Sequence, residues 1–199
     1  MRLTVVGSSG SVPGPDSACS CYLVEQDGFR LLLDLGTGAV GPLQRHVAPA
    51  DVGAVVVTHA LGDHWADLVE LGYLRTLPDA GPAPPLPVHG PANLRPVVRE
   101  ENPSVYAFTT ISPGERRVGP FALRFAAVEH IEHSHAGRVD DALCYTGDTA
   151  ACAALDELAA GCEVLLAEAS GVSGLLRGGH LTAADTGRLA ARSGARRRD

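Results

Sequence analysis

The sequence is poor in aromatic side chains, which make up 5% of its 199 residues, and it contains no lysine. A core must therefore be built mainly from Val, Leu and Ala. No apolar run is long enough to span a membrane, and no basic-then-apolar leader precedes the strand-like residues 3–6. The five cysteines include no C-x-x-C pair, which argues against a zinc ribbon or a redox motif. We therefore expect a cytoplasmic protein in a reducing environment, without a membrane partner.

The acidic balance of the chain, a net charge of −7, does not suit a general nucleic-acid-binding protein, which neutralises many phosphates with basic side chains. A small-molecule or nucleotide substrate fits this charge better. The only basic run is Arg196-Arg197-Arg198, which we expect to be a solvated tail. The length and the ordinary content of apolar and charged residues, 45% and 20%, predict one globular domain over residues 1–199.

Strands and helices alternate along the chain, and several strands come in hairpins. Residues 2–6 read as a short buried strand, and a turn signal at Gln26-Asp27-Gly28 separates strand patterns over residues 21–25 and 30–34. Residues 53–58 form a valine-rich run that is typical of a strand buried on both faces. This mixture predicts an α/β fold, a four-layer αββα sandwich of two mixed β-sheets, rather than a doubly wound parallel sheet.

Two segments have clear helical patterns. Residues 63–77 carry apolar side chains at helical spacing, among them Trp65, which we expect to pack this helix onto the sheet. Asp67 is expected to be a first-turn acid favoured by the helix dipole. The second helix is predicted over residues 182–193 and begins with a loose capping box, T-A-A-D.

The segment after the valine-rich strand carries three potential metal ligands within six residues, namely His59, Asp63 and His64. Side chains at a strand end are held by the sheet and face an open loop, where the active sites of layered α/β folds lie. Imidazole nitrogens and a carboxylate oxygen suit zinc or another borderline divalent metal. A surface hydrogen-bonding cluster would have the same composition, so this segment alone leaves both interpretations open.

Two further strand ends add candidate ligands. A strand pattern over residues 121–128 ends in Glu129-His130, and another over residues 143–146 ends in Gly147-Asp148-Thr149. A glycine beside Asp148 lets the backbone turn sharply, which brings the carboxylate close to a metal. Three strands that each end in a plausible ligand favour a metal site over coincidence.

Taken together, these motifs resemble those of the metallo-β-lactamase superfamily. The loop that contains His59 and His64 is similar to the motif H-x-H-x-D-H. The other segments match, in family order, the G-x-x-G-S-x-P-x-P opening of the ribonuclease Z and cyclic-phosphodiesterase-like branch, a D-x-G turn, an S/T-G-D-T motif and a G-H-x-T segment. In this sequence they are Gly7-Ser8-Ser9-Gly10-Ser11-Val12-Pro13-Gly14-Pro15, Asp34-Leu35-Gly36, Tyr145-Thr146-Gly147-Asp148-Thr149 and Gly179-His180-Leu181-Thr182. The resemblance covers nearly the whole chain and implies the fold of that superfamily.

The resemblance also implies a hydrolase with two metal positions. His59 and His130 would bind one metal, Asp63 and His64 would bind the other, and Asp148 would bridge them. A water or hydroxide between the metals would be the nucleophile, because two cations lower its pKa and polarise the scissile bond. Asp63 would also orient this water or take its proton. The implied cofactor is one or two zinc ions, with manganese as another option.

His180 has two interpretations. It resembles the histidine that helps to protonate the leaving group in the ribonuclease-like branch. Alternatively, it lies near a helix cap and bonds to backbone.

Two departures from the family pattern bear on activity. Leu61 stands where the motif has its second histidine, and leucine cannot bind a metal; His133 and His135 are candidate substitutes, although exposed loop positions are the simpler expectation for them. Family members also continue after the last helix into a strand that delivers a final histidine ligand. No residue after His180 can be that histidine. We therefore expect the C-terminal strand to be missing, a sheet edge to be uncovered and the sequence to be a truncated or frame-shifted form of a longer protein.

Two functions follow from these observations. The first is hydrolysis of a phosphodiester or another ester, with a cyclic nucleotide or an RNA end as substrate, and with a thioesterase or lactonase as the neighbouring option on the same fold. The second is a catalytically impaired or non-catalytic relative that binds a ligand or partner. A small domain with incidental histidines is the third and plainest interpretation. An uncovered sheet edge would also allow a homodimer.

Overall fold

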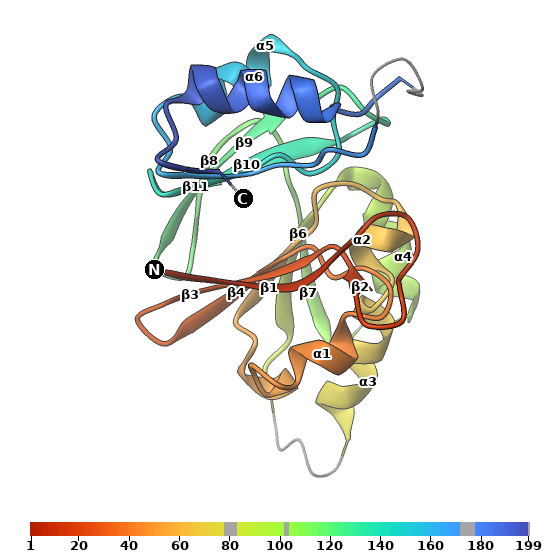
Figure 1. The fold of residues 1–199 in the computed structure, drawn as a ribbon. Coiled ribbons are helices and arrows are strands. Elements are labelled where there is room, and N and C mark those ends of the chain that lie inside the picture. The colour runs from red at the N-terminus through yellow and green to blue at the C-terminus, as the bar shows by residue number, and fades with distance from the viewer. Residues whose placement is uncertain (78–82, 102–103, 172–177, 199) are drawn as a thin grey trace. The chain divides into compact units, whose positions relative to one another are not determined.

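The computed structural model describes residues 1–77, 83–101, 104–171 and 178–198. The chain divides into two compact units, Met1–Thr110 and Ile111–Asp199 (Figure 1). The strands of the first unit are β1 (Arg2–Ser9), β2 (Ala18–Cys19), β3 (Cys21–Gln26), β4 (Phe29–Leu33), β5 (Ala54–Val56), β6 (Leu86–Gly90) and β7 (Tyr106–Thr110). They form one mixed sheet in the order β2-β1-β3-β4-β5-β6-β7, in which β4 to β7 run parallel.

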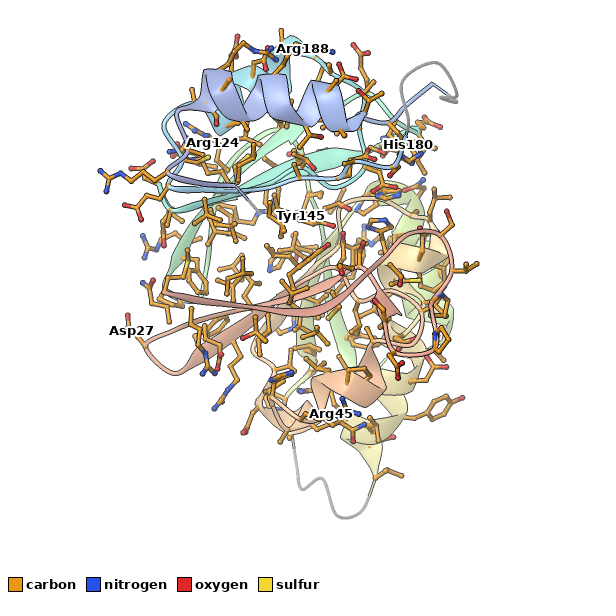
Figure 2. All side chains as sticks on the ribbon, in the orientation of Figure 1. Asp27, Arg45, Arg124, Tyr145, His180 and Arg188 are labelled. Carbon is orange, nitrogen blue, oxygen red and sulfur yellow. The ribbon has the colours of Figure 1, made fainter. Side chains whose placement is uncertain are left out.

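The hairpin between β3 and β4 confirms the turn predicted from the sequence. Asp27 and Gly28 both have positive φ, 51° and 79°, and Asp27 lies at the outer end of the hairpin (Figure 2). Beyond this turn the two strands pair antiparallel from Gln26 and Phe29 to Tyr22 and Leu33. β4 then leads directly into the D-x-G turn, which begins at Asp34.

Helices cover one face of the first sheet. They are α1 (Val40–Leu43), α2 (Gly62–Trp65), α3 (Leu68–Thr76) and α4 (Arg95–Glu101), with 3-10 turns η1 (Pro49–Asp51) and η3 (Ala92–Leu94). Leu43 of α1 and Leu71 of α3 belong to the same buried apolar cluster as Leu23 of β3 and Val55 of β5. Trp65 packs against this cluster, as the sequence predicted.

The first strand differs from its prediction as a buried element. β1 forms, but it extends to Ser9 and most of its residues are partly or fully exposed, with Val5 52% exposed. The reason is its position in the sheet. On one side β1 pairs along its length with β3, whereas on the other side β2 pairs only with Gly7 and Ser9. Most of one edge of β1 therefore borders no described strand.

The second unit contains the other mixed sheet. Its strands are β8 (Gly114–Val118), β9 (Phe121–Ala127), β10 (His135–Val139), β11 (Leu143–Tyr145), β12 (Val164–Leu166) and β13 (Arg197–Arg198). The order is β13-β12-β11-β10-β9-β8, antiparallel from β8 to β11 and parallel from β11 to β13. Each unit thus supplies a mixed sheet, and the predicted α/β class with two mixed sheets is confirmed.

Two helices, α5 (Ala153–Ala159) and α6 (Ala183–Ser193), cover one face of the second sheet (Figure 1). Leu155 and Leu158 of α5 and Leu189 of α6 share a buried cluster with Cys144 and Leu165 of the sheet. This packing places the loops that leave β11 and β12 beside the start of α6. The second set of candidate ligands lies on these loops and on the loop after β9.

The C-terminal arginines differ from the predicted solvated tail. Gly194 ends α6 with a φ of 72°, and the backbone of Arg197 and Arg198 then pairs parallel with Val164 and Leu165 of β12. β13 is therefore a strand of two residues at the sheet edge where the sequence suggested a missing strand.

The start of α6 is fixed by a full capping box. The Thr182 hydroxyl accepts from the Asp185 N–H at 3.0 Å, and the Asp185 carboxylate accepts from the Thr182 N–H at 3.1 Å. Hydrogen bonds from Thr182, and then from the Arg188 guanidinium (Figure 2), lower the pKa of Asp185 to about 2. The capping box thus favours the charged form of this side chain.

We expect Asp185→Asn to destabilise the protein near neutral pH and to have less effect in acid. The folded-state pKa lies below that of the unfolded chain, about 3.9, so this contribution is fully present above about pH 4 and is lost as the pH falls towards 2. Urea unfolding midpoints of the wild type and the variant, compared from pH 6 to pH 2, would show the difference shrinking over that window. A difference that stays constant with pH would contradict the prediction.

The cysteines are free thiols in this fold. All five are unpaired by disulfides, and Cys19, Cys21, Cys144 and Cys162 are buried. Burial raises the pKa of the Cys144 thiol to about 12 and that of Cys21 still further above its ordinary value.

No helix among the described residues is long and apolar enough to cross a membrane.

Candidate metal centre

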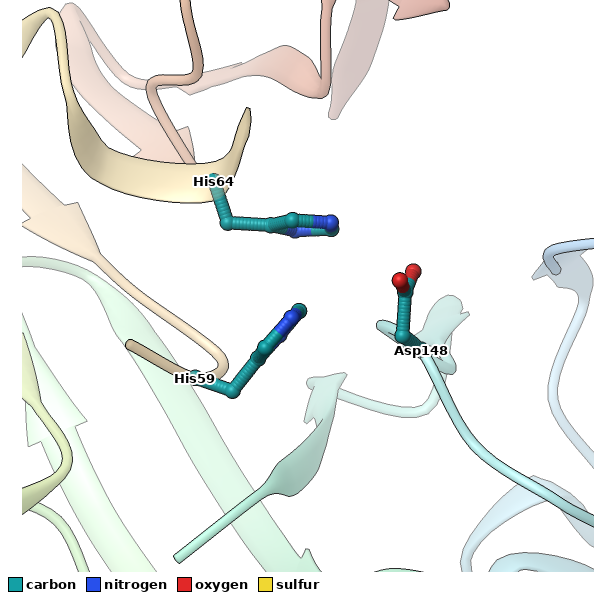
Figure 3. Close-up of side chains that lie close together, drawn as sticks. All are labelled: His59, His64 and Asp148. Atoms are coloured by element: carbon teal, nitrogen blue, oxygen red, sulfur yellow. The ribbon is translucent and has the colours of Figure 1, made fainter. Parts of the chain in front are cut away.

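The first set of candidate ligands follows β5. All residues of β5 are buried, so the sheet fixes the point where the chain leaves it and enters the loop that carries His59. α2 then presents Asp63 and His64. The imidazole rings of His59 and His64 lie against each other, with centroids 4.1 Å apart and planes at 50° (Figure 3). His64 Nε2 is 3.7 Å from Asp63 Oδ2, so the structure brings all three predicted residues together.

A single buried carboxylate, Asp34, holds this segment from the turn after β4. Its Oδ1 accepts from the backbone N–H of Thr58 at 2.7 Å, and its Oδ2 accepts from the Thr58 hydroxyl at 2.9 Å. Oδ2 also accepts from His64 Nδ1 at 2.7 Å. The sequence placed Asp34 near the metals only through the family resemblance. The hydrogen bonds show its task, which is to orient His64 directly and the strand end through Thr58.

These bonds decide which nitrogen of each neutral ring carries the proton. A carboxylate oxygen only accepts, so His64 Nδ1 is the donor and Nε2 keeps its lone pair. The Thr58 hydroxyl donates its one proton to Asp34, so it accepts from His59 Nδ1 at 3.0 Å. Nε2 is therefore the nitrogen of both histidines that could bind a metal, while Nδ1 is held by a hydrogen bond, as is usual in metal sites.

The helix predicted over residues 63–77 is in fact two helices, α2 and α3, and the break has a local cause. Leu35 donates its backbone N–H to the carbonyl of His64 at 2.8 Å and accepts from the N–H of Asp67 at 3.2 Å. The turn after β4 therefore takes two backbone bonds that a continuous helix would make internally. Gly36 permits this docking, because a Cβ there would lie 1.8 Å from a backbone oxygen of α2.

Asp67 does not act as the predicted first-turn acid. It is the N-cap residue of α3, but its side chain makes no cap bond to that helix. Instead it accepts from the N–H groups of Gly38 at 2.9 Å and Val40 at 2.8 Å, at the start of α1. The prediction was wrong because these partners are 29 and 27 residues away in the chain.

The second unit brings together the other three predicted residues. Asp148 Oδ2 lies 4.0 Å from His130 Nε2 and 3.8 Å from His180 Nδ1. The rings of His130 and His180 meet edge to face, with centroids 4.6 Å apart. Asp148 follows β11 on a turn (Figure 3) in which Gly147 has a φ of 54°. The sharp turn predicted beside Asp148 is thus confirmed.

Sequence analysis missed Glu168, which follows β12 and positions two of these groups. Its Oε1 accepts from the N–H of Thr149 at 2.6 Å, and this bond fixes the turn that carries Asp148. Both of its oxygens accept from His180 Nδ1, at 3.1 and 3.0 Å. β12 pairs directly with β11, so the strand-end argument that singled out Asp148 would also have found Glu168.

Leu61 and the two candidate substitutes add no ligand to these sets. Leu61 is the N-cap residue of α2 and is 39% exposed. His133 has a φ of 65° and is exposed beside Glu132, 3.4 Å away. His135 is buried on β10, and burial lowers its pKa. Among the described residues, neither histidine belongs to a group of side chains close enough to share a metal.

The donor sets fit a divalent metal. Two ligand atoms bound to one zinc ion at about 2.0–2.2 Å lie roughly 3–4 Å apart. The separations of 3.7 Å between Asp63 and His64 and of 4.0 Å between His130 and Asp148 match this spacing. The ligand atoms of His130, Asp148 and His180 all lie within 4.8 Å of one another.

This arrangement agrees with the comparison to known families. A family model described as a beta-lactamase superfamily domain matches residues 29–198. The chain belongs to the metallo-β-lactamase superfamily. The members of this superfamily are metal-dependent hydrolases that typically bind divalent metals, and the predicted resemblance is thereby confirmed.

The chain is similar to several individual proteins of the superfamily or of its fold. It is 34% identical to the uncharacterised protein ML1173 of Mycobacterium leprae, over 98% of this chain and 75% of that protein. The metallo-β-lactamase fold protein YhfI of Bacillus subtilis has the same fold, with a TM-score of 0.91, 23% identity and coverage of 98% and 83%. The short form of human tRNase Z gives a TM-score of 0.84 at 18% identity, over 100% of this chain and 90% of that one.

Proposed function

We propose that this chain is a metal-dependent hydrolase that cleaves a phosphodiester or another ester bond with an activated water molecule. The observation that carries the proposal is that three of the candidate ligands, all histidines, are hydrogen-bonded through the same ring nitrogen. In His59, His64 and His130, a hydrogen bond holds the proton of the neutral ring on Nδ1, which makes Nε2 the nitrogen that can bind a metal. Incidental surface histidines have no reason to share this arrangement.

The proposed ligands follow the family pattern. His59 and His130 would hold one metal, Asp63 and His64 would hold a second, and Asp148 would contribute to both, in which case both units would act as one domain. Zinc fits this mixture of nitrogen and carboxylate ligands, and manganese is the other option. When bound, such a metal supplies Lewis acidity and lowers the pKa of a water molecule.

The side chains around the ligands handle protons. Asp63 lies beside His64, where a carboxylate orients the attacking water or accepts its proton. Glu168 accepts a hydrogen bond from His180 Nδ1 and orients the ring. When this ring is doubly protonated, it can give its Nε2 proton to the leaving group and keep the bond to Glu168. His180 Nδ1 lies 3.8 Å from Asp148 Oδ2, next to the proposed metals.

The proposed substrate is small and carries a phosphodiester, such as a cyclic nucleotide or an RNA end. The human relative is named as a tRNase Z, which supports phosphodiester cleavage. The net charge of −7 favours a small substrate over a long nucleic acid. The cytoplasmic location and the homodimer predicted from the sequence stay predictions, and size-exclusion chromatography with light scattering would test the latter.

One observation favours a second candidate function, a relative without catalysis that binds a ligand or partner. Leu61 occupies the place of a ligand and supplies no donor atom, and neither His133 nor His135 belongs to a group of described side chains that could share a metal. A metal position that has lost a ligand binds more weakly, which would leave the fold without turnover.

The natural chain and Leu61→His, assayed side by side, separate these candidates. We expect the natural chain to keep zinc after dialysis and to hydrolyse bis(p-nitrophenyl) phosphate, and Leu61→His to bind zinc at least about 10-fold more tightly because it regains a ligand. Elemental analysis and calorimetric titration measure the metal, and absorbance measures turnover. Turnover only in Leu61→His would establish the non-catalytic relative, and zinc binding by neither protein would overturn the hydrolase proposal.

A further inference from the structure

A backbone carbonyl holds the imidazole of His130. His130 lies in the loop after β9, and its Nδ1 is 2.9 Å from the carbonyl oxygen of Gly179, which is 49 residues further along the chain. A carbonyl oxygen can only accept a hydrogen bond, so Nδ1 is the donor. The neutral ring therefore carries its proton on Nδ1 and presents Nε2, the nitrogen that faces Asp148.

Only glycine fits the position that offers this carbonyl. Gly179 has a φ of 98°, a conformation that side chains rarely tolerate. A Cβ at Gly179 would lie 3.1 Å from His130 Nδ1 and 3.6 Å from the Cα of His130. An alanine at position 179 would therefore crowd the imidazole ring of His130. The neighbouring Gly178 has no such demand, because a Cβ there would meet nothing within 4 Å.

We propose that Gly179 is a positioning residue for the metal ligand His130. Its carbonyl selects the tautomer that presents Nε2, and its lack of a side chain lets the imidazole sit against the backbone. The inference rests on the proposed function in one respect, namely that His130 binds the metal. Gly179 touches neither metal nor substrate and acts through His130 alone.

The same short segment serves a second group. The next residue, His180, is bound to Glu168 and lies 3.8 Å from Asp148. Gly179 thus positions a metal ligand through its carbonyl, and the next residue, His180, offers a proton through its own side chain. A displaced Gly179 would mainly weaken metal binding through His130, whereas a change of the His180 side chain would mainly affect proton transfer. This difference separates the two roles.

The matched pair Gly179→Ala and Gly178→Ala tests the proposal with zinc as the probe. We expect Gly179→Ala to lower zinc affinity by about 10–100-fold, the usual effect of losing a partner that orients a ligand, and Gly178→Ala to leave it unchanged. Cobalt substitution gives a spectroscopic check, because the visible bands report the geometry of the ligands. Thermal unfolding of both metal-free variants shows whether the fold is kept.

Equal zinc affinity in the two variants, with the natural chain binding zinc, would overturn the role of Gly179 and leave the proposed function standing. A natural chain that binds no zinc would overturn the proposed function. The tautomer then still decides the hydrogen bond, since long-range nitrogen–proton correlation spectra of the metal-free natural chain show which nitrogen of His130 carries the proton. A proton on Nδ1 supports the inference, and a proton on Nε2 contradicts it even if Gly179→Ala does not fold.

Discussion

Asp148→Asn is expected to reduce zinc binding and hydrolysis by roughly 1,000-fold or more. Losing a partner outside the metal shell already costs about 10–100-fold, and a bridging ligand contributes to both metal positions. The amide has nearly the same shape as the carboxylate but carries no charge, so the effect reports lost coordination rather than lost packing. Calorimetric zinc titration and hydrolysis of bis(p-nitrophenyl) phosphate measure the two losses.

Asp156→Asn is the matched control for this substitution. Asp156 belongs to the same unit and pairs with Arg192 on the surface of α5 and α6, where both side chains are well exposed. Removing one exposed charge there should change neither zinc affinity nor turnover. If Asp148→Asn bound zinc as tightly as Asp156→Asn, Asp148 would not be a ligand and the two-metal arrangement would be wrong.

Asp34→Asn should lower zinc affinity by about 100-fold, although Asp34 touches no metal in the proposed arrangement. Its carboxylate accepts from Thr58 twice and from His64 once. An amide turns one of these oxygens into a donor that faces another donor. The fixed tautomer of His64 is then lost, and that of His59 weakens through Thr58. The expected size is the upper end of the range for partners that orient ligands, because two ligands depend on Asp34.

The same substitution at Asp67 separates orientation from stability. Asp67 is also a buried carboxylate of the first unit, but it accepts only from the backbone of Gly38 and Val40. We expect Asp67→Asn to lower the unfolding midpoint as Asp34→Asn does, while zinc affinity stays near that of the natural chain. Equal losses of affinity in the two variants would show that a general loosening of the fold, and not the hydrogen bonds to histidine, controls metal binding.

The positions of several candidate ligands were predictable because they follow strands with a strong pattern. His59 follows the buried valine run and Asp148 follows β11, and the family motifs fixed their order. Local signals also predicted the turn at Asp27 and the capping box at Thr182, and both are present. These features depend on residues that are neighbours in the chain.

The features that the sequence did not predict depend on distant partners. Glu168 has no motif of its own, and its role follows from contacts with Thr149 and His180, 19 and 12 residues away. The split between α2 and α3 comes from backbone bonds to Leu35, a residue of another element. Hydrophobic periodicity describes one helix at a time and carries no record of such docking.

The close approach of Gly36 to α2 has a consequence for how related sequences are interpreted. The turn passes so close to the backbone of α2 that any side chain at Gly36 would push the two segments apart. The fold therefore requires a glycine at this position. A lineage that abandoned catalysis would therefore still retain this glycine for as long as it retained the fold. The position of Leu61, which is partly exposed at the start of α2, is under no such restriction. In a survey of relatives, the turn would mark the fold, and the residue at the position of Leu61 would mark how strongly the site can hold a metal.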